Sequence, residues 1–224
     1  VFAVLKEALQ QWNPAQDPQG LLPSRAIRAM GTLDKSVPGL AAHLWDLTQP
    51  ESRNRRAEAF IALRQLGLES SDLPALSQLL RSSTGTGESP ALRRFVPQAI
   101  RDIIRQDPDG AAPHLQGLVQ ILAQSDDPNL RFSAAAALAG SPLGNDPRVL
   151  ESIQTRMREG LNVSPTDRRA ADVSMALEVA AAAGPAAAPL IPDLLVVART
   201  SHQAYERDAA WQAIDAIQPS LRKE

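Results

Sequence analysis

An arginine that returns at a nearly constant interval constrains this chain more than any other feature of its sequence. Successive members of the series lie 37 or 38 residues apart, and each stands near the start of an alanine-rich segment. The series is Arg56, Arg93 or Arg94, Arg131, Arg169 and Arg207. Self-similarity at a fixed period of this length is typical of stacked repeats, in which each unit is one supersecondary element. We therefore expect an array of similar units of about 38 residues.

The first half of each unit has the pattern of an amphipathic helix that opens with proline. Proline is tolerated in the first turn of a helix, where its missing N–H has no intrahelical partner. The prolines are Pro38, Pro74, Pro113 and Pro189, and Glu151 takes the corresponding place in the fourth unit. Apolar residues follow two and six positions later, a spacing that predicts one buried helical face. The pairs are Leu40/Leu44, Leu76/Leu80, Leu115/Val119, Ile153/Met157 and Ile191/Leu195.

The second half of each unit has its own apolar register, four and seven residues after the arginine. The pairs are Phe60/Leu63, Pro97/Ile100, Ala135/Leu138, Val173/Ala176 and Trp211/Ile214, with the second unit counted from Arg93 after a Ser/Gly/Thr-rich loop at 82–90. Apolar residues make up 44% of the 224 residues, but aromatic residues only 4%. A core built from small and aliphatic side chains suits closely packed helices better than a β-sandwich. We expect an all-α fold.

Units of two helices, with proline early in the first and arginine early in the second, resemble HEAT repeats. The resemblance covers about residues 36–218, five repeats, and is clearest at 112–139, where the turn Ser125–Arg131 carries an aspartate ahead of the arginine. In the turns at 48–51 and 200–203 this aspartate is missing. The resemblance implies a right-handed α-α superhelix, an armadillo-like solenoid of five to six helical hairpins.

The remaining segments complete this expected organisation. Residues 1–35 should form a divergent N-terminal helix pair, with helices at 1–12 and 19–30, and 219–224 a short tail. We expect the whole chain, 1–224, to be one repeat domain. The sequence begins at Val1 rather than at methionine, which is compatible with a cleaved upstream segment or a longer repeat protein, and it assigns no cell compartment.

Charge narrows the classes of partner. A formal net charge of −2 gives no general attraction for nucleic acid or an anionic membrane. Positive charge is concentrated on arginine, because only Lys6, Lys35 and Lys223 are lysines. HEAT-like DNA glycosylases show that this architecture can bind nucleic acid, but the chain offers few aromatic side chains for base stacking. Nucleic-acid binding is the alternative to protein binding, and it is disfavoured.

The sequence offers no constellation for catalysis, a metal or a cofactor. It has no cysteine, and His43, His114 and His202 are far apart and outside any H-E-x-x-H pattern. No G-x-S-x-G elbow or phosphate-binding glycine loop occurs. We therefore expect a non-enzyme without cofactors; a relation to HEAT-like bilin lyases is a remote alternative by fold analogy alone. No membrane span is expected, because the alanine-rich stretch at 179–188 is shorter than the ~20 residues required and is interrupted by Gly184 and Pro185.

The arginines have two candidate roles. Resemblance to the repeat family implies that the periodic arginine holds the turn of its own repeat, for which its fork of donors is well suited. Surplus arginines, together with Trp45, which lies off the repeat register and is a candidate for exposure, are available for a partner. We predict a protein-binding scaffold that docks an extended or helical segment on a concave face formed by the second helices. The candidate partner-binding residues are Arg55, Arg93, Arg131, Arg168, Arg207 and Trp45.

Overall fold

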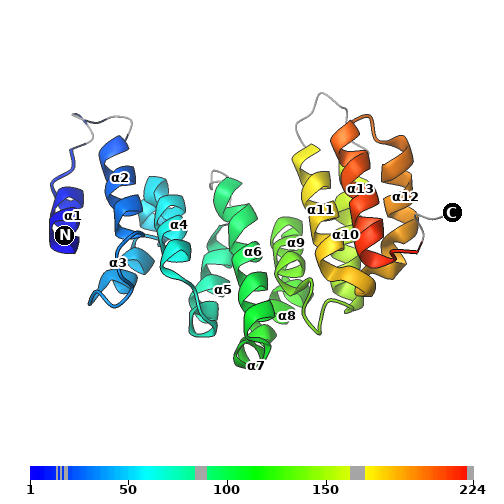
Figure 1. The fold of residues 1–224 in the computed structure, drawn as a ribbon, viewed down its shortest axis with the longest axis horizontal. Helices are drawn as coiled ribbons and strands as arrows, with labels where there is room; N and C mark the ends of the chain where they lie inside the picture. Colours follow the sequence, from blue (N-terminus) through cyan, green and yellow to red (C-terminus); the bar gives the residue numbers. More distant parts are fainter. Residues whose placement is uncertain (14, 16, 18–19, 84–89, 162–169, 221–224) are drawn as a thin grey trace. The chain divides into compact units, whose positions relative to one another are not determined.

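The fold was obtained as a computed structural model, which describes residues 1–224 except 14, 16, 18–19, 84–89, 162–169 and 221–224 (Figure 1). Every regular element in this described part is a helix, which confirms the expected all-α class. The chain divides into two compact units, an N-terminal unit, Val1–Ala99, and a C-terminal unit, Ile100–Glu224. Each is described by itself below.

The N-terminal unit consists of short helices that pack as hairpins. Its elements are α1 (Phe2–Gln10), α2 (Leu21–Met30), α3 (Leu40–Asp46), the 3-10 helix η1 (Pro50–Arg55), α4 (Arg56–Leu66), the 3-10 helix η2 (Ser70–Asp72), α5 (Leu73–Ser82) and the first part of α6 (Pro90–Gln106). Helix α1 packs on α2, α3 packs on α4, and α2 packs on α4. The two helices expected in residues 1–35 are therefore present, while most of the predicted loop at 82–90 lies outside the described residues.

Close backbone approach fixes the contact between α2 and α4. A side chain added at Gly31 would stand 2.8 Å from the Cα of Ala62, so only glycine fits at this crossing. Around it lies the core of the N-terminal unit, in which Ile27, Met30 and Leu44 are inaccessible to solvent. Small residues at the crossing thus let aliphatic side chains from three helices meet.

The C-terminal unit contains three complete hairpins after the end of α6. Its elements are α7 (Pro108–Ala111), the 3-10 helix η3 (Ala112–His114), α8 (Leu115–Gln124), α9 (Pro128–Leu138), α10 (Pro147–Leu161), α11 (Ala170–Ala183), the 3-10 helix η4 (Gly184–Leu190), α12 (Ile191–Thr200) and α13 (Ala204–Ile217). Within the hairpins α8 packs on α9, α10 on α11, and α12 on α13. Between them α9 packs on α10, α11 on α13, and α10 on α12, as the neighbouring ribbons in Figure 1 show.

Helix α9 is buried on all sides from Phe132 to Leu138. The Asp127 side chain caps its N-terminus by accepting a hydrogen bond from the backbone N–H of Asn129 at 2.8 Å, and Pro128 follows in the first turn. Every residue from Phe132 to Leu138 is buried, including four consecutive alanines. A helix that is apolar around its whole circumference belongs inside a protein, and α9 accordingly lies between α8 and α10.

The predicted apolar register is correct in part. The pairs in α3, α5 and α10 are buried, and so are all the second-helix pairs except Trp211, which is half-buried. In α8 and α12 the prediction is wrong by one position, because Leu118 and Leu194 are buried while Val119 and Leu195 are half-buried. Ile191 is half-buried as well.

For α12 the cause of this error lies in the 3-10 helix η4. Pro189, from which the register was counted, lies in η4, and each residue of a 3-10 helix turns the chain further than a residue of an α-helix. In α8 the first member of the pair, Leu115, is buried as predicted, and the buried face continues three residues later at Leu118 rather than four residues later at Val119.

One apolar stretch, Val173–Thr200, has the length and composition of a membrane-crossing helix, with a mean hydropathy of 1.6. The sequence analysis had found no such stretch. The structure divides it, because α11 ends at Ala183 and the 3-10 helix η4, with Pro185 and Pro189, separates it from α12. Both α-helices pack against α13. The length and composition are therefore weak evidence for a membrane span, since the same residues build the core of the C-terminal unit.

Candidate functional site

The periodic arginine of the C-terminal unit bonds to the turn that precedes it. Arg131 Nη1 donates to the carbonyl of Ser125 at 2.7 Å, and Arg207 Nη1 donates to the carbonyl of Ser201 at 2.8 Å. In both cases the acceptor lies six residues before the arginine, directly after the first helix of the hairpin. These bonds satisfy a carbonyl that the end of the first helix leaves without an intrahelical partner.

Arg56, the periodic arginine of the N-terminal unit, is more deeply engaged. Its side chain has no exposed surface. Its Nε donates to the carbonyl of Thr48 at 2.7 Å, and its Nη2 donates to the Ser82 hydroxyl at 2.6 Å. Arg56 therefore joins the turn of its own hairpin to the end of α5. The periodic arginine acts as a structural brace at the three positions where its contacts are described.

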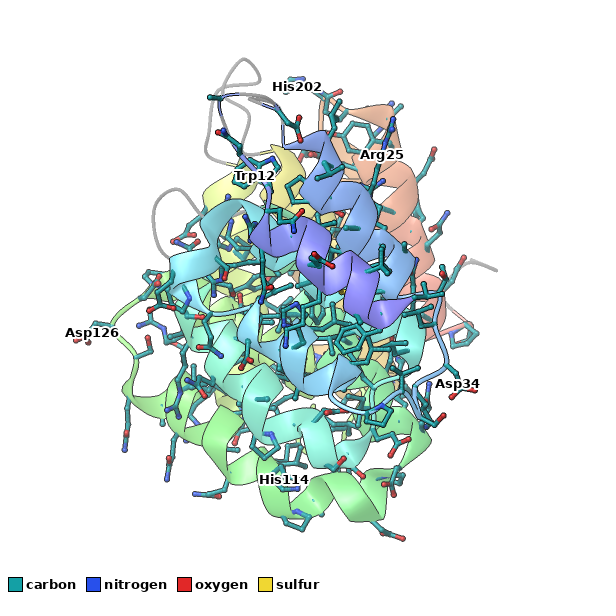
Figure 2. The ribbon with its side chains drawn as sticks, turned by 90° about the vertical axis from the view of Figure 1, so that its left-hand side faces the viewer. Trp12, Arg25, Asp34, His114, Asp126 and His202 are labelled. Atoms are coloured by element: carbon teal, nitrogen blue, oxygen red, sulfur yellow. The ribbon has the colours of Figure 1, made fainter. Side chains whose placement is uncertain are left out.

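The described candidate partner-binding residues are divided between the two units, with Arg55, Arg93 and Trp45 in the N-terminal unit and Arg131 and Arg207 in the C-terminal unit. The guanidinium carbon of Arg55 lies 5.0 Å from the ring centre of Trp12, whose Nε1 donates to Asp17; Figure 2 shows Trp12 beyond the end of α1. Arg93 is exposed on α6. Arg168, like Arg169 of the periodic series, lies outside the described residues.

Trp45 also differs from expectation. It is half-buried and packs against the core of the N-terminal unit rather than projecting as an exposed aromatic side chain. A register counted along one helix does not include its neighbours, and the apolar core residues against which Trp45 packs come largely from other helices. Trp45 is therefore part of the packing.

A groove in the C-terminal unit brings together arginines that the sequence did not connect. It has a volume of about 270 Å³ and lies at the C-terminal end of α8, the first turn of α9 and one face of α10. Asp126, in the turn between α8 and α9, projects outward in Figure 2. The charged residues that line the groove are Arg131, Arg148, Glu151, Arg156 and Glu159.

Arg156 is the most deeply buried of these arginines, with 9% of its surface exposed. Its Nη2 donates to the Asn129 side-chain oxygen at 2.7 Å, and its guanidinium carbon lies 5.1 Å from the ring centre of Phe132. Both partners belong to α9, so Arg156 connects α10 to the preceding hairpin. A hydrogen bond and an aromatic face together fix the plane of the guanidinium group.

Arg148 lies near the start of α10 and is more exposed. Its Nε and Nη2 donate to the two carboxylate oxygens of Asp146, at 3.0 and 2.6 Å. The bond from Arg148 holds the pKa of Asp146 below its ordinary value. Asp146 also accepts the backbone N–H of Arg148 at 2.9 Å, so the carboxylate orients the arginine beside the groove.

The sequence analysis missed Arg148 and Arg156. For Arg156 a signal was available, because this residue lies 38 positions from Leu118 on one side and from Leu194 on the other. Those leucines are buried, so an arginine occupies a core position of the repeat. The apolar register considered only apolar side chains and therefore passed over it. Arg148 carries no comparable sequence signal.

A second pair of arginines lies on α6 in the C-terminal unit. Arg105 Nη2 donates to the carbonyl of Ala182, at the end of α11, at 3.0 Å. Burial lowers the pKa of Arg101, and the neighbouring Arg105 lowers it further. Gly140, which follows the short helix α9, leaves the space through which Arg105 reaches α11. These residues connect helices, and the groove remains the one described cavity that includes a predicted partner-binding residue, Arg131.

Within the described part of the chain, no three His, Asp or Glu side chains gather as a metal site would require. The chain matches no model of a known protein family, and no curated protein matches it. Family membership thus contributes nothing to the assignment of function, and the groove is the feature from which function can be argued.

Proposed function

We propose that this chain is a non-catalytic binding protein, an α-solenoid of HEAT-like repeats that docks a segment of another protein. The observation that carries the proposal is the groove between α8, α9 and α10, which is lined by Arg131, Arg148 and Arg156. Neighbouring hairpins in a repeat array commonly form such extended binding surfaces. The arginines of the groove are held by hydrogen bonds and an ion pair, an arrangement suited to recognition.

The residues that line the groove favour a protein over a nucleic acid. Glu151 and Glu159 lie among the arginines, so a chain of phosphates would meet two negative charges in the same small space. A protein segment can present both signs of charge together with apolar groups. Leu122 and Pro128, which also line the groove, provide apolar contacts for such a segment.

Site-specific photo-crosslinking tests this proposal. A benzophenone amino acid would replace Thr155, which is exposed and lines the groove, and in a control would replace Gln212, an exposed residue of α13. We expect a defined protein to be crosslinked from position 155 and not from position 212. Crosslinking of nucleic acid from position 155 would instead support the alternative function. Equal crosslinking from both positions would contradict a groove-centred function.

A further inference from the structure

The burial of Arg156 is unfavourable on packing grounds alone. Leucines lie 38 residues from Arg156 on either side, Leu118 in α8 and Leu194 in α12, each with at most 1% of its surface exposed. Replacing a buried, paired charge by a well-packed apolar side chain is often neutral or stabilising. A guanidinium group at this position therefore needs a reason other than the stability of the helix contact.

The consequence of this arginine is electrostatic. Its charge is fixed in the wall of the groove, where surrounding protein screens it less than water would. Asn129 and Phe132 hold it in place. Glu159, 4.0 Å from Nη1, and Glu151 also line the groove, so the three arginines exceed the two glutamates of the lining by one positive charge, which suits a single carboxylate. An anion that enters would be attracted without displacing these contacts.

Two other arginines supply hydrogen-bond donors at the same groove. Among the described residues, Arg131 uses only Nη1, to bond Ser125, and Arg148 uses Nε and Nη2, to bond Asp146. An arginine carries donors on all three of its nitrogens. Nε and Nη2 of Arg131 and Nη1 of Arg148 thus have no acceptor within the described structure.

We propose that the groove binds the carboxylate of an acidic side chain in the protein partner, with Arg131 and Arg148 as the donors and Arg156 as the fixed positive wall. This inference rests on the proposed function. A planar carboxylate matches the fork of arginine donors. A volume of about 270 Å³ holds one or two side chains, which fits a single acidic side chain that enters from the partner's surface.

The test uses the intact chain and two matched peptides that differ in one side chain, an acetylated and amidated Gly-Glu-Gly peptide (the glutamate peptide) and its Gly-Gln-Gly counterpart (the glutamine peptide), with inorganic phosphate as a third probe. Binding is followed through the NMR signals of the arginine Nε–H groups. We expect saturable shifts with the glutamate peptide and none with the glutamine peptide. Arg148→Gln should weaken glutamate-peptide binding about tenfold, the effect of losing one charge-assisted hydrogen bond.

Arg158→Gln is the control, because Arg158 lies on the same helix, is also exposed and also pairs with one carboxylate, Asp193 at 2.9 Å, but does not line the groove. It should leave peptide binding unchanged. Equal weakening by both variants, or equal binding of the two peptides, would overturn the inference. Tighter binding of phosphate than of the glutamate peptide would also overturn it, in favour of a site for a small inorganic anion.

The inference and the proposed function can fail separately. If position 155 crosslinks a protein but the glutamate peptide does not bind, the acidic-side-chain inference fails and the binding function stands. If the glutamate peptide binds with the expected dependence on Arg148 but no protein is crosslinked, the protein-binding function fails and the carboxylate chemistry of the groove stands.

Discussion

Arg56 in the N-terminal unit and Arg131 in the C-terminal unit belong to the same arginine series but differ in burial and in the number of segments to which they bond. Arg56 is wholly buried and bonds both to its own turn, at Thr48, and to α5, at Ser82. Arg131 is half-buried and bonds only to its own turn, at Ser125. In the C-terminal unit a second arginine, Arg156, makes the connection between neighbouring hairpins.

This difference determines which arginine can leave donors available at a groove. A buried guanidinium group must have its donors satisfied within the protein, because an unsatisfied buried charge is strongly destabilising. Arg56 therefore has nothing to offer a partner. In the C-terminal unit Arg156, rather than Arg131, connects α10 to α9. Part of the Arg131 side chain therefore remains at the surface of the groove.

The comparison predicts that Arg56→Met will be the most destabilising of the changes considered. It leaves the buried carbonyl of Thr48 without its donor, at about 2 kcal/mol, and the half-buried oxygens of Ser82 without theirs, at about 1 kcal/mol, so the N-terminal unit should lose about 3 kcal/mol. Urea unfolding, followed by hydrogen exchange in α3, α4 and α5, measures the loss. Arg55→Met is the control and should cost about 1 kcal/mol or less, since it removes only the contact with Trp12. Equal losses of stability in the two variants would contradict the assignment of a special structural role to Arg56.

Gly140→Ala tests a different arginine connection in the C-terminal unit. Gly140 has a φ of +81°, and an added Cβ would lie 2.9 Å from the Ala182 carbonyl oxygen and 3.0 Å from Arg105 Nε. We expect a loss of about 2 kcal/mol, from the backbone conformation and the displacement of Arg105. Gly184→Ala is the matched control: its φ is +57° with no atom within 4 Å, so only the backbone term of about 1 kcal/mol applies. Thermal unfolding of both variants measures the difference. A lower melting temperature for Gly184→Ala than for Gly140→Ala would contradict this prediction.

Arg207→Met should destabilise the C-terminal unit by only about 1 kcal/mol, since one hydrogen bond to Ser201 is lost from a half-buried side chain. Hydrogen exchange in α12 and α13 reports this change directly. Arg199→Met, at an exposed position of α12, serves as the reference. A loss of stability as large as that for Arg56→Met would show that the periodic arginine contributes equally to the stability of both units.

The smallest expected effect is a pH dependence of the N-terminal unit. His43 lies edge-on to the Phe2 ring, with the ring centres 5.9 Å apart. Burial lowers the pKa of His43 from its ordinary value of 6.5, Lys6 lowers it further, and Asp46 opposes the shift. The unfolded chain therefore takes up the proton first, so stability is complete above about pH 6.5 and declines as the pH falls below it.

Unfolding midpoints measured by urea titration between about pH 7.5 and 5.5 would show this decline. In His43→Gln the slope over that range should flatten, because the titrating group is gone. A midpoint that rises as the pH is lowered, or a slope unchanged in the variant, would contradict the assignment to His43.

Much of the all-α fold was predictable because the arginine series marks the beginnings of helices. Arg56, Arg131 and Arg207 each lie within the first four residues of a helix, and the N-terminal helix pair was expected from the prolines that separate its members. The register was wrong at Leu195 because it was counted through the 3-10 helix η4, and at Val119 because the buried neighbour of Leu115 is the residue three positions later, Leu118. The position of Trp45 depends on how neighbouring helices cover α3, which no local pattern encodes.

The groove was less predictable than the fold. Arg131 was a candidate, but its companions come from α10, and pairing them requires the contact between α9 and α10 to be known. Arg156 was detectable in principle as an arginine at a leucine position of the repeat. Arg148 depends on the orientation that Asp146 imposes, which a spacing rule cannot supply.

The buried helix α9 restricts how this molecule can change over evolutionary time. Its four alanines at 134–137 are buried, and an added methylene in a filled core typically costs about 1 to 3 kcal/mol. Exposed residues of α10 can be substituted at much lower cost. Relatives of this chain should therefore keep small residues in α9 even where the charges of the groove have diverged.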